Sequence, residues 1–134
     1  MIGSLAWVAL GGALGSVARY ATVRAVAAFL GEFQPWGTLA VNVIGSFAMG
    51  FVAALIARKF TDADTVRVLL MPGFLGGFTT FSAFSLDVFN LMQRGENGTA
   101  VAYVLGSVLL SLAAVFAGYA LMALGIAWRS LPLL

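Results

Sequence analysis

Four apolar runs without charged residues constrain this chain more than any other feature. They cover residues 1–18, 33–57, 68–86 and 97–128, and the first apolar pattern continues past Arg19 and Arg24 to about residue 30. A transmembrane helix needs roughly 20 apolar residues. Backbone that crosses a bilayer must be a helix or a closed barrel, and these continuous runs lack the alternation of barrel strands. The runs therefore predict an all-helical integral membrane protein.

The composition agrees with a chain that lies almost wholly in lipid. Of its 134 residues, 62% are apolar and 9% are charged, whereas soluble domains average about 25% charged residues. We expect one four-helix transmembrane domain, with spans at about 2–30, 36–58, 66–93 and 99–128. The first apolar run exceeds signal-peptide length and no basic residue precedes it, so we interpret it as the first span of a multi-pass protein of the cell membrane.

Residue types that are missing from the chain exclude several classes of function. The net charge of +2 comes from scattered side chains, so there is no basic cluster to bind nucleic acid. The chain has no cysteine and no histidine, which removes thiol chemistry, the commonest general base and the commonest transition-metal ligand. We therefore expect neither an enzyme nor a nucleic-acid partner.

The basic residues give little information about orientation. Four of them share the side of the N-terminus and three fall on the other side: Arg58, Lys59, Arg67 and Arg129 against Arg19, Arg24 and Arg94. The positive-inside rule needs a larger bias to fix a topology. Two interpretations follow, a weakly specified single topology or insertion in both directions, and the second would allow an antiparallel dimer.

Polar and small residues inside the spans recur at helical spacing. Thr38, Asn42 and Ser46 share one face of the second span, and Tyr103, Ser107 and Ser111 do the same in the last; Gly11 and Gly15 have GxxxG spacing in the first. Small residues and hydroxyls serve helix packing in membranes. Polar side chains in a span also line water-filled paths. Both interpretations stay open here.

The third span carries the sequence GFLGGFTTFSAF at residues 73–84, preceded by Pro72. Proline and glycine together favour a break near residues 75–79, which is either an ion site or a packing kink. Phe78, Phe81 and Phe84 are three residues apart and would share one helical face. That stripe is either core and lipid contact or a row of ring edges facing a small anion, with Ser82 and Ser85 beside it.

These residues resemble the Fluc (CrcB) family of small fluoride channels along nearly the whole chain. The strongest match is GFLGGFTTFSAFS in the third span, followed by WGTLAVNVIGS in the second and GGALGSVARY in the first. The resemblance implies an antiparallel, dual-topology homodimer with two fluoride paths and a central structural Na⁺. It also implies passive efflux of cytosolic fluoride, which protects the cell from fluoride toxicity.

The resemblance further implies roles for individual residues. Backbone carbonyls of Gly76 and Thr79 from each copy would hold the Na⁺, and Arg19 would lie at an aqueous vestibule. The anion path would comprise Asn42, Thr80, Phe81, Ser82, Phe84, Ser85, Tyr103, Ser107 and Ser111. The chain departs from the family pattern at Ala83, where threonine is usual, and at Asp87, where glutamate is usual.

Two other functions remain as alternatives. Small multidrug-type transporters also have four spans and insert in both directions. They look like proteins that depend on a carboxylate in the first span for proton coupling. The first span of this chain has only arginines as charged residues. A structural subunit of a larger membrane complex would use every polar stripe for packing.

Overall fold

The predicted all-helical architecture is confirmed. The computed structural model describes residues 2–31, 35–59 and 64–129. The elements are α1 (Ile2–Leu30), α2 (Trp36–Lys59), α3 (Asp64–Val68), the π-helix η1 (Leu69–Leu75), α4 (Gly76–Phe78), α5 (Phe81–Gln93) and α6 (Asn97–Arg129). Four stretches are long and apolar enough to cross a membrane: Ile2–Leu30, Trp36–Ala57, Asp64–Gln93 and Asn97–Gly125. The chain is thus a multi-pass membrane protein.

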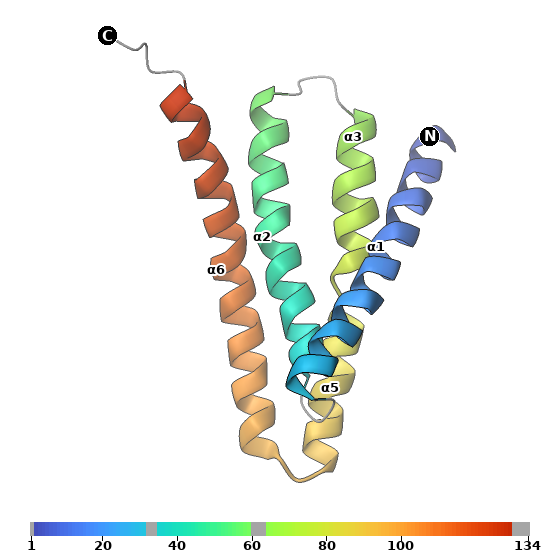
Figure 1. Cartoon of the computed structure of the whole chain (residues 1–134), viewed down its shortest axis with the longest axis vertical. Helices are drawn as coiled ribbons and strands as arrows, with labels where there is room; N and C mark the ends of the chain where they lie inside the picture. The colour runs from blue at the N-terminus through green and yellow to red at the C-terminus, as the bar shows by residue number, and fades with distance from the viewer. Residues whose placement is uncertain (1, 32–34, 60–63, 130–134) are drawn as a thin grey trace.

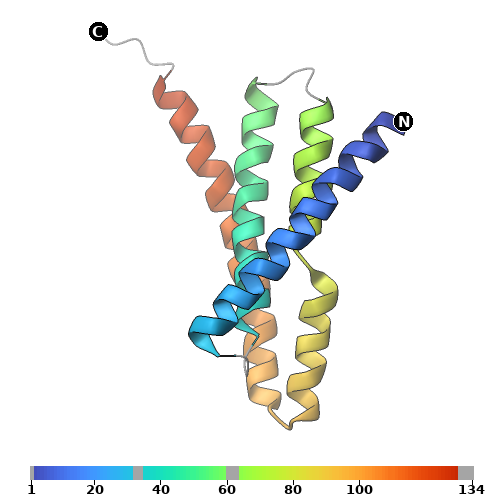
Figure 2. The ribbon, with the colours of Figure 1, turned by 45° about the vertical axis from the view of Figure 1, so that its right-hand side comes forward.

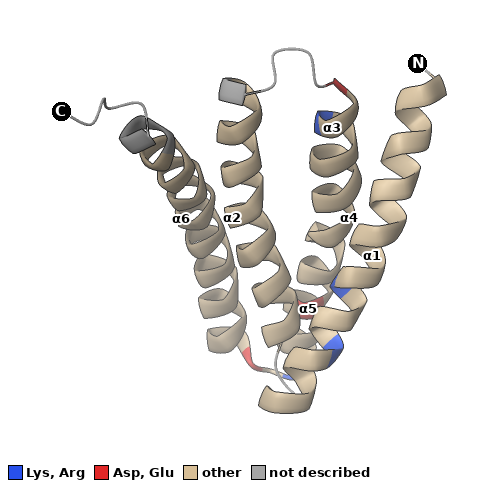
Figure 3. Cartoon of the chain, turned by 45° about the horizontal axis from the view of Figure 1, so that its top comes forward, with Lys and Arg blue, Asp and Glu red and all other residues tan. Residues whose placement is uncertain are grey.

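The four stretches run alternately up and down, and the start of α1 and the end of α6 lie at the same end of the bundle (Figure 1). Helix α2 packs along α6, whereas α1 packs on η1 and α4. The α5–α6 hairpin extends beyond the start of α2 (Figures 1 and 2). Few charged residues interrupt the ribbon (Figure 3). The side chains of Arg58, Lys59 and Arg129, which entered the topology argument, lie outside the described part of the chain.

Glycines allow α2 and α6 to approach until their backbones touch. A Cβ atom at Gly50 would collide with the carbonyl oxygen of Val115, and one at Gly118 would collide with the carbonyl oxygen of Phe47. Such close approach of small residues is the usual basis of helix association in lipid. The pairing is reciprocal and fixes α6 against α2, which sets the distance between their two polar stripes.

Helix α1 is held against the third stretch in the same way. A Cβ atom at Gly11 would collide with the carbonyl oxygen of Leu69, and one at Gly15 with that of Phe74. The GxxxG pair of the first span therefore serves helix packing, one of the two interpretations of its spacing.

The third stretch leaves the helical conformation at Thr79 and Thr80. Thr79 has φ −80° and ψ 159°, Thr80 has φ −153° and ψ 121°, and α5 begins at the next residue. Pro72 lies upstream inside η1, where the backbone N–H of Gly76 bonds to Met71 in the wider π turn. Pro72 and Gly73 are thus accommodated within the π-helix. The extended residues Thr79 and Thr80 come later, after Gly76 and Gly77.

One prediction about this stretch is wrong. Phe78, Phe81 and Phe84 do not share a helical face, because the two extended residues separate Phe78 from the other two. Phe78 is buried and stacks on Phe74 with ring centroids 6.2 Å apart. Phe84 is buried under Tyr103, whereas Phe81 is 78% exposed. Phe81 and Phe84 remain neighbours, with centroids 5.4 Å apart.

Candidate functional site

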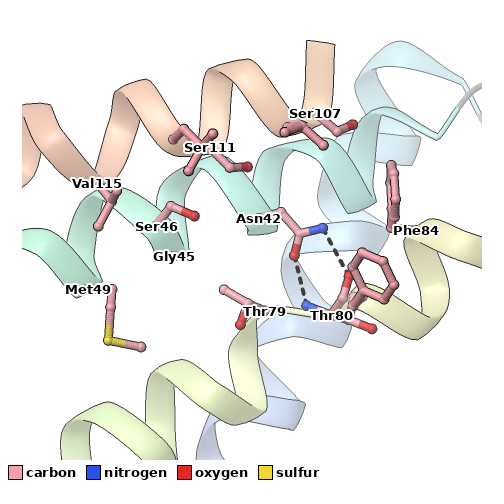
Figure 4. Close-up of a pocket in the computed structure, with 13 residues that line it drawn as sticks. Asn42, Gly45, Ser46, Met49, Thr79, Thr80, Phe84, Ser107, Ser111 and Val115 are labelled. Carbon is pink, nitrogen blue, oxygen red and sulfur yellow. Dashed lines mark hydrogen bonds between the residues drawn. The ribbon is translucent and has the colours of Figure 1, made fainter. Parts of the chain in front are cut away.

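Asn42 on α2 holds the extended residues of the third stretch in place. Its Nδ2 donates to the carbonyl oxygen of Thr80 at 3.0 Å, and its Oδ1 accepts from the backbone N–H of Thr80 at 2.8 Å (Figure 4). One amide side chain therefore bonds both backbone groups of Thr80, whose N–H makes no helical bond. This pair of bonds explains why the chain is extended at Thr80, since the N–H of Thr80 would otherwise continue the helix by bonding to the Gly76 carbonyl.

The interruption brings together two helix ends of opposite polarity. Helix α5 begins with Thr80 as its N-cap, whose Oγ1 accepts from the backbone N–H of Ala83 at 3.2 Å. On the other side, the backbone N–H of Thr79 makes the last helical bond, to Leu75 at 3.0 Å. The N–H groups that open a helix favour anions, and the carbonyls that close one favour cations. A helix end that favours cations and a helix end that favours anions thus lie within a few residues of each other along the chain.

A cavity of about 380 Å³ opens beside the interruption, between α2, α5 and α6. It gathers six of the nine residues that were predicted to line an anion path: Asn42, Thr80, Phe81, Phe84, Ser107 and Ser111. Ser46 from α2 also lines it, so side chains from the polar stripes of the neighbouring helices α2 and α6 line the same space, opposite Thr79 and Thr80 (Figure 4). Met49, Leu112 and Val115 form an apolar part of its wall.

Ser107 carries a buried hydroxyl that makes no hydrogen bond of good geometry among the described residues, although the hydroxyl of Tyr103 lies beside it. The residue is 5% exposed, and among the described residues its Oγ is the buried side-chain polar atom without a hydrogen-bond partner. A buried donor without an acceptor costs about 1–3 kcal/mol. Because Ser107 lines the cavity, an acceptor that enters the cavity would remove this cost.

The other predicted site residues lie outside the cavity wall. Ser85 donates to the carbonyl of Phe81 at 2.9 Å, and Ser82 lies 3.2 Å from the hydroxyl of Thr80; both are exposed on α5. Tyr103 is buried, and its hydroxyl donates to Asp87 Oδ2 at 3.2 Å. Arg19 is half-buried on α1.

The backbone at the end of α4 has carbonyl oxygens that are suitable ligands for a hard monovalent cation. Gly76 is exposed and Thr79 is half-buried, so their carbonyls are near the protein surface. The Gly76 carbonyl loses its helical partner because the N–H of Thr80 bonds to Asn42. Among the described residues there is no cluster of three histidine, cysteine or acidic side chains that would hold a metal. Carbonyl oxygens at a helix end fit Na⁺ by chemistry.

A second cavity of about 250 Å³ was not predicted from the sequence. It lies between the end of α1, the start of α2 and α5, and its wall includes Arg24, Thr38 and Asp87. Arg24, not the predicted vestibule residue Arg19, thus lines this opening. The helical spacing of Thr38 and Asn42 was the sequence signal for a functional role of Thr38. No pattern in the sequence indicated that Arg24 and Asp87 would line the same cavity.

Comparison with known proteins assigns the chain to a family. The family model of CrcB-like proteins, described as Camphor Resistance (CrcB), matches residues 6–119. The "Fluoride-specific ion channel FluC" of Chelativorans sp. (strain BNC1) is 58% identical over 111 residues, which cover 83% of this chain and 89% of the relative. Proteins of the same name in Rhizobium etli and Rhodospirillum centenum are 55% identical over 115 residues and 53% identical over 120 residues. These alignments cover 86% and 90% of this chain, and 92% and 95% of the respective relatives. The chain therefore belongs to the CrcB-like protein family.

Proposed function

We propose that this chain forms a fluoride-selective channel through which cytosolic fluoride leaves the cell passively. The observation that carries the proposal is the buried, unpartnered hydroxyl of Ser107 in a cavity beside an interrupted span. The family relatives named as fluoride-specific channels support the choice of ion.

The chemistry of the cavity suits a small, strongly hydrated anion. Fluoride sheds water only where many O–H and N–H donors replace it, and Ser46, Ser107 and Ser111 offer hydroxyls around one space. Asn42 uses one of its two amide hydrogens on Thr80, which leaves the second for the ion. The cavity wall contains no Lys or Arg among the described residues, so no fixed cation would trap the ion.

The phenylalanines at the start of α5 add a weak electrostatic attraction. The edge of a phenyl ring carries partial positive charge. Phe81 and Phe84 meet at an interplanar angle of 46°, so their edges point in different directions around the cavity. A ring edge holds an anion loosely, which lets the ion leave again.

The active unit in this proposal is an antiparallel homodimer with two fluoride paths. Phe81 and the Gly76 backbone are exposed on a single copy, and unpaired backbone carbonyls that face lipid are costly. A second copy would cover both features, and the small charge bias of the sequence permits opposite insertion. Each copy contributes one cavity beside its interruption, hence two paths.

The dimer proposal has a direct test because the chain contains no cysteine. A single Asn97→Cys substitution at the exposed start of α6 provides one thiol for a membrane-impermeant label. We expect label from both faces of the membrane in comparable amounts. Labelling from one face only would contradict dual topology.

We also propose that Gly76 and Thr79 carbonyls hold a structural Na⁺ where two copies meet. When bound, the ion would supply positive potential near the anion paths. Replacing Na⁺ by N-methylglucamine during purification should lower the thermal stability of the assembly, and Na⁺ should restore it. Equal melting temperatures in the two buffers would refute the sodium site.

The test of the channel itself is efflux from liposomes loaded with fluoride or chloride, followed with ion-selective electrodes. The proposal requires fast fluoride efflux and negligible chloride efflux. Liposomes without protein provide the control for leakage. Absence of fluoride flux, or chloride flux of similar size, would reject the proposed function.

A further inference from the structure

The polar stripes of α2 and α6 stop at the same level of the bundle. Ser46 and Ser111 are the last serines of these stripes, and the next position of each, four residues on, is Gly50 or Val115. A Cβ atom at Gly50 would collide with the carbonyl oxygen of Val115, so the two helices touch at this level. An ion that follows the serines therefore reaches a place where the backbones of α2 and α6 close the space between them.

Met49 lies at this end of the cavity beside the interruption. It follows Ser46 by three residues on α2, is half-buried, and lines the cavity wall together with Leu112 and Val115. Figure 4 shows its side chain extending from α2 into the space between α2 and the third stretch. Since α2 and α6 are in contact here, the way out at this end runs past Met49.

This end of the cavity offers an anion no side-chain donor among the described residues that line it. The thioether of Met49 has no hydrogen to donate. Thr79 is also on the wall, but its hydroxyl already donates to the carbonyl of Leu75 at 3.0 Å. The free hydroxyls of the wall thus stop at Ser46 and Ser111, and an ion beyond them must rely on water.

We propose that Met49 is a gating residue, whose side chain closes this end of the cavity until it swings aside and lets fluoride pass. This inference rests on the proposed function. Methionine is unbranched and has three rotatable bonds, so its side chain can move where the backbone contact of Gly50 with Val115 cannot. Hydrophobic constrictions hinder ions because water withdraws from them. The step past Met49 is accordingly the slow step of passage through the protomer.

The experiment compares fluoride efflux from liposomes for two variants of similar size. Met49→Gln keeps an unbranched side chain and adds amide N–H donors, so we expect the efflux rate to rise on the order of tenfold, the factor that about 1.4 kcal/mol makes in a rate. Met49→Ile keeps the apolar character but fixes the first side-chain torsion. Its efflux should fall below the natural rate.

The matched control is Met92→Gln, the same change at an exposed residue near the end of α5 that is not part of this cavity wall. It should leave efflux unchanged, and an equal rise in both variants would overturn the proposal. If Met49→Gln lowers the melting temperature, Met49→Ala decides, because a shortened side chain also opens the constriction. Efflux that rises in neither Met49→Gln nor Met49→Ala would overturn the gate.

A measurement without transport separates this inference from the proposed function. The chain has no cysteine, so a single introduced thiol reports contact with water. We expect Met49→Cys to react with a small water-soluble methanethiosulfonate reagent, because a thiol must ionise to react. Ile44→Cys should react far more slowly, since Ile44 is exposed on α2 but not part of the cavity wall.

The two possible failures can be told apart. Equal reaction at both thiols, or an unreactive Met49→Cys in a protein that conducts fluoride, would overturn the gate. A reactive Met49→Cys in a protein that carries no fluoride would refute the proposed function.

Discussion

The bonds between Asn42 and Thr80 give the sharpest prediction, because one amide satisfies both backbone groups of an extended residue. The substitution Asn42→Asp keeps the acceptor for the N–H of Thr80 and loses the donor to its carbonyl. A carboxylate oxygen then faces the carbonyl oxygen at the position where the 3.0 Å bond was made. The same carboxylate places a negative charge on the wall of the cavity beside the interruption.

The magnitude follows from the lost bond. A hydrogen bond contributes about 1 kcal/mol net, and an unsatisfied buried partner costs about 1–3 kcal/mol. The extended conformation at Thr80 should therefore lose about 3 kcal/mol relative to competing conformations, which is on the order of a hundredfold in its population. The conformational change can thus lower efflux by up to this factor, and repulsion of fluoride by the carboxylate lowers it further.

Two assays check the prediction. Efflux from liposomes measures the loss of conduction, and thermal unfolding in detergent measures the loss of stability. The stability difference from the natural chain should shrink as pH falls, because a protonated carboxyl regains an O–H that can donate to the Thr80 carbonyl.

The matched control is Asn97→Asp at the exposed first residue of α6, where a carboxylate is favoured by the helix dipole. It should leave efflux and stability unchanged. Efflux at the natural rate in Asn42→Asp, or an equal loss in the control, would refute the reasoning.

The remaining predictions concern packing and donors. Phe81→Ile keeps apolar bulk and removes the ring edge, so efflux should collapse while the protein still elutes as the same assembly; normal efflux would contradict the ring-edge role. Ser107→Ala removes a donor without a protein partner, so efflux should fall about tenfold with no loss of thermal stability; a large loss of stability would show that the hydroxyl is structural. Gly118→Ala should destabilise the fold by about 1–3 kcal/mol through collision with α2, measured by denaturant unfolding. Gly106→Ala in the same helix has open space around it and should be neutral; equal effects of the two would contradict the packing account.

The helical fold could be predicted because it depends on local sequence properties. Apolar run length identified the four spans, and a spacing of four placed Asn42 with Ser46 and Ser107 with Ser111. These pairs do line one cavity. The packing role of Gly11 and Gly15 could be suspected from spacing, but the contact with η1 decided it.

The details of the third stretch could not be predicted because tertiary contacts determine them. Pro72 is the strongest helix breaker in the third stretch, yet a π turn accommodates it. The helix is interrupted later, where Asn42 captures Thr80 from another span. The predicted face of three phenylalanines was wrong for the same reason, since it assumed that the helix continues through Thr79 and Thr80.

The contact between Asp87 and Tyr103 could not be predicted from the sequence either. The two residues are 16 positions apart on different helices, and only the geometry of the α5–α6 hairpin brings them together. Asp87 was noted as a departure from the family pattern, but its partner could not be inferred from that.

The selectivity of conduction in a planar bilayer tests the central claim most directly. With fluoride on one side and chloride on the other, the account predicts a reversal potential that follows the fluoride gradient and does not respond when chloride is replaced by a large impermeant anion. A reversal potential that moves with chloride would contradict a fluoride path through the cavity of Asn42, Ser107 and Phe81, and so would membranes that carry no current.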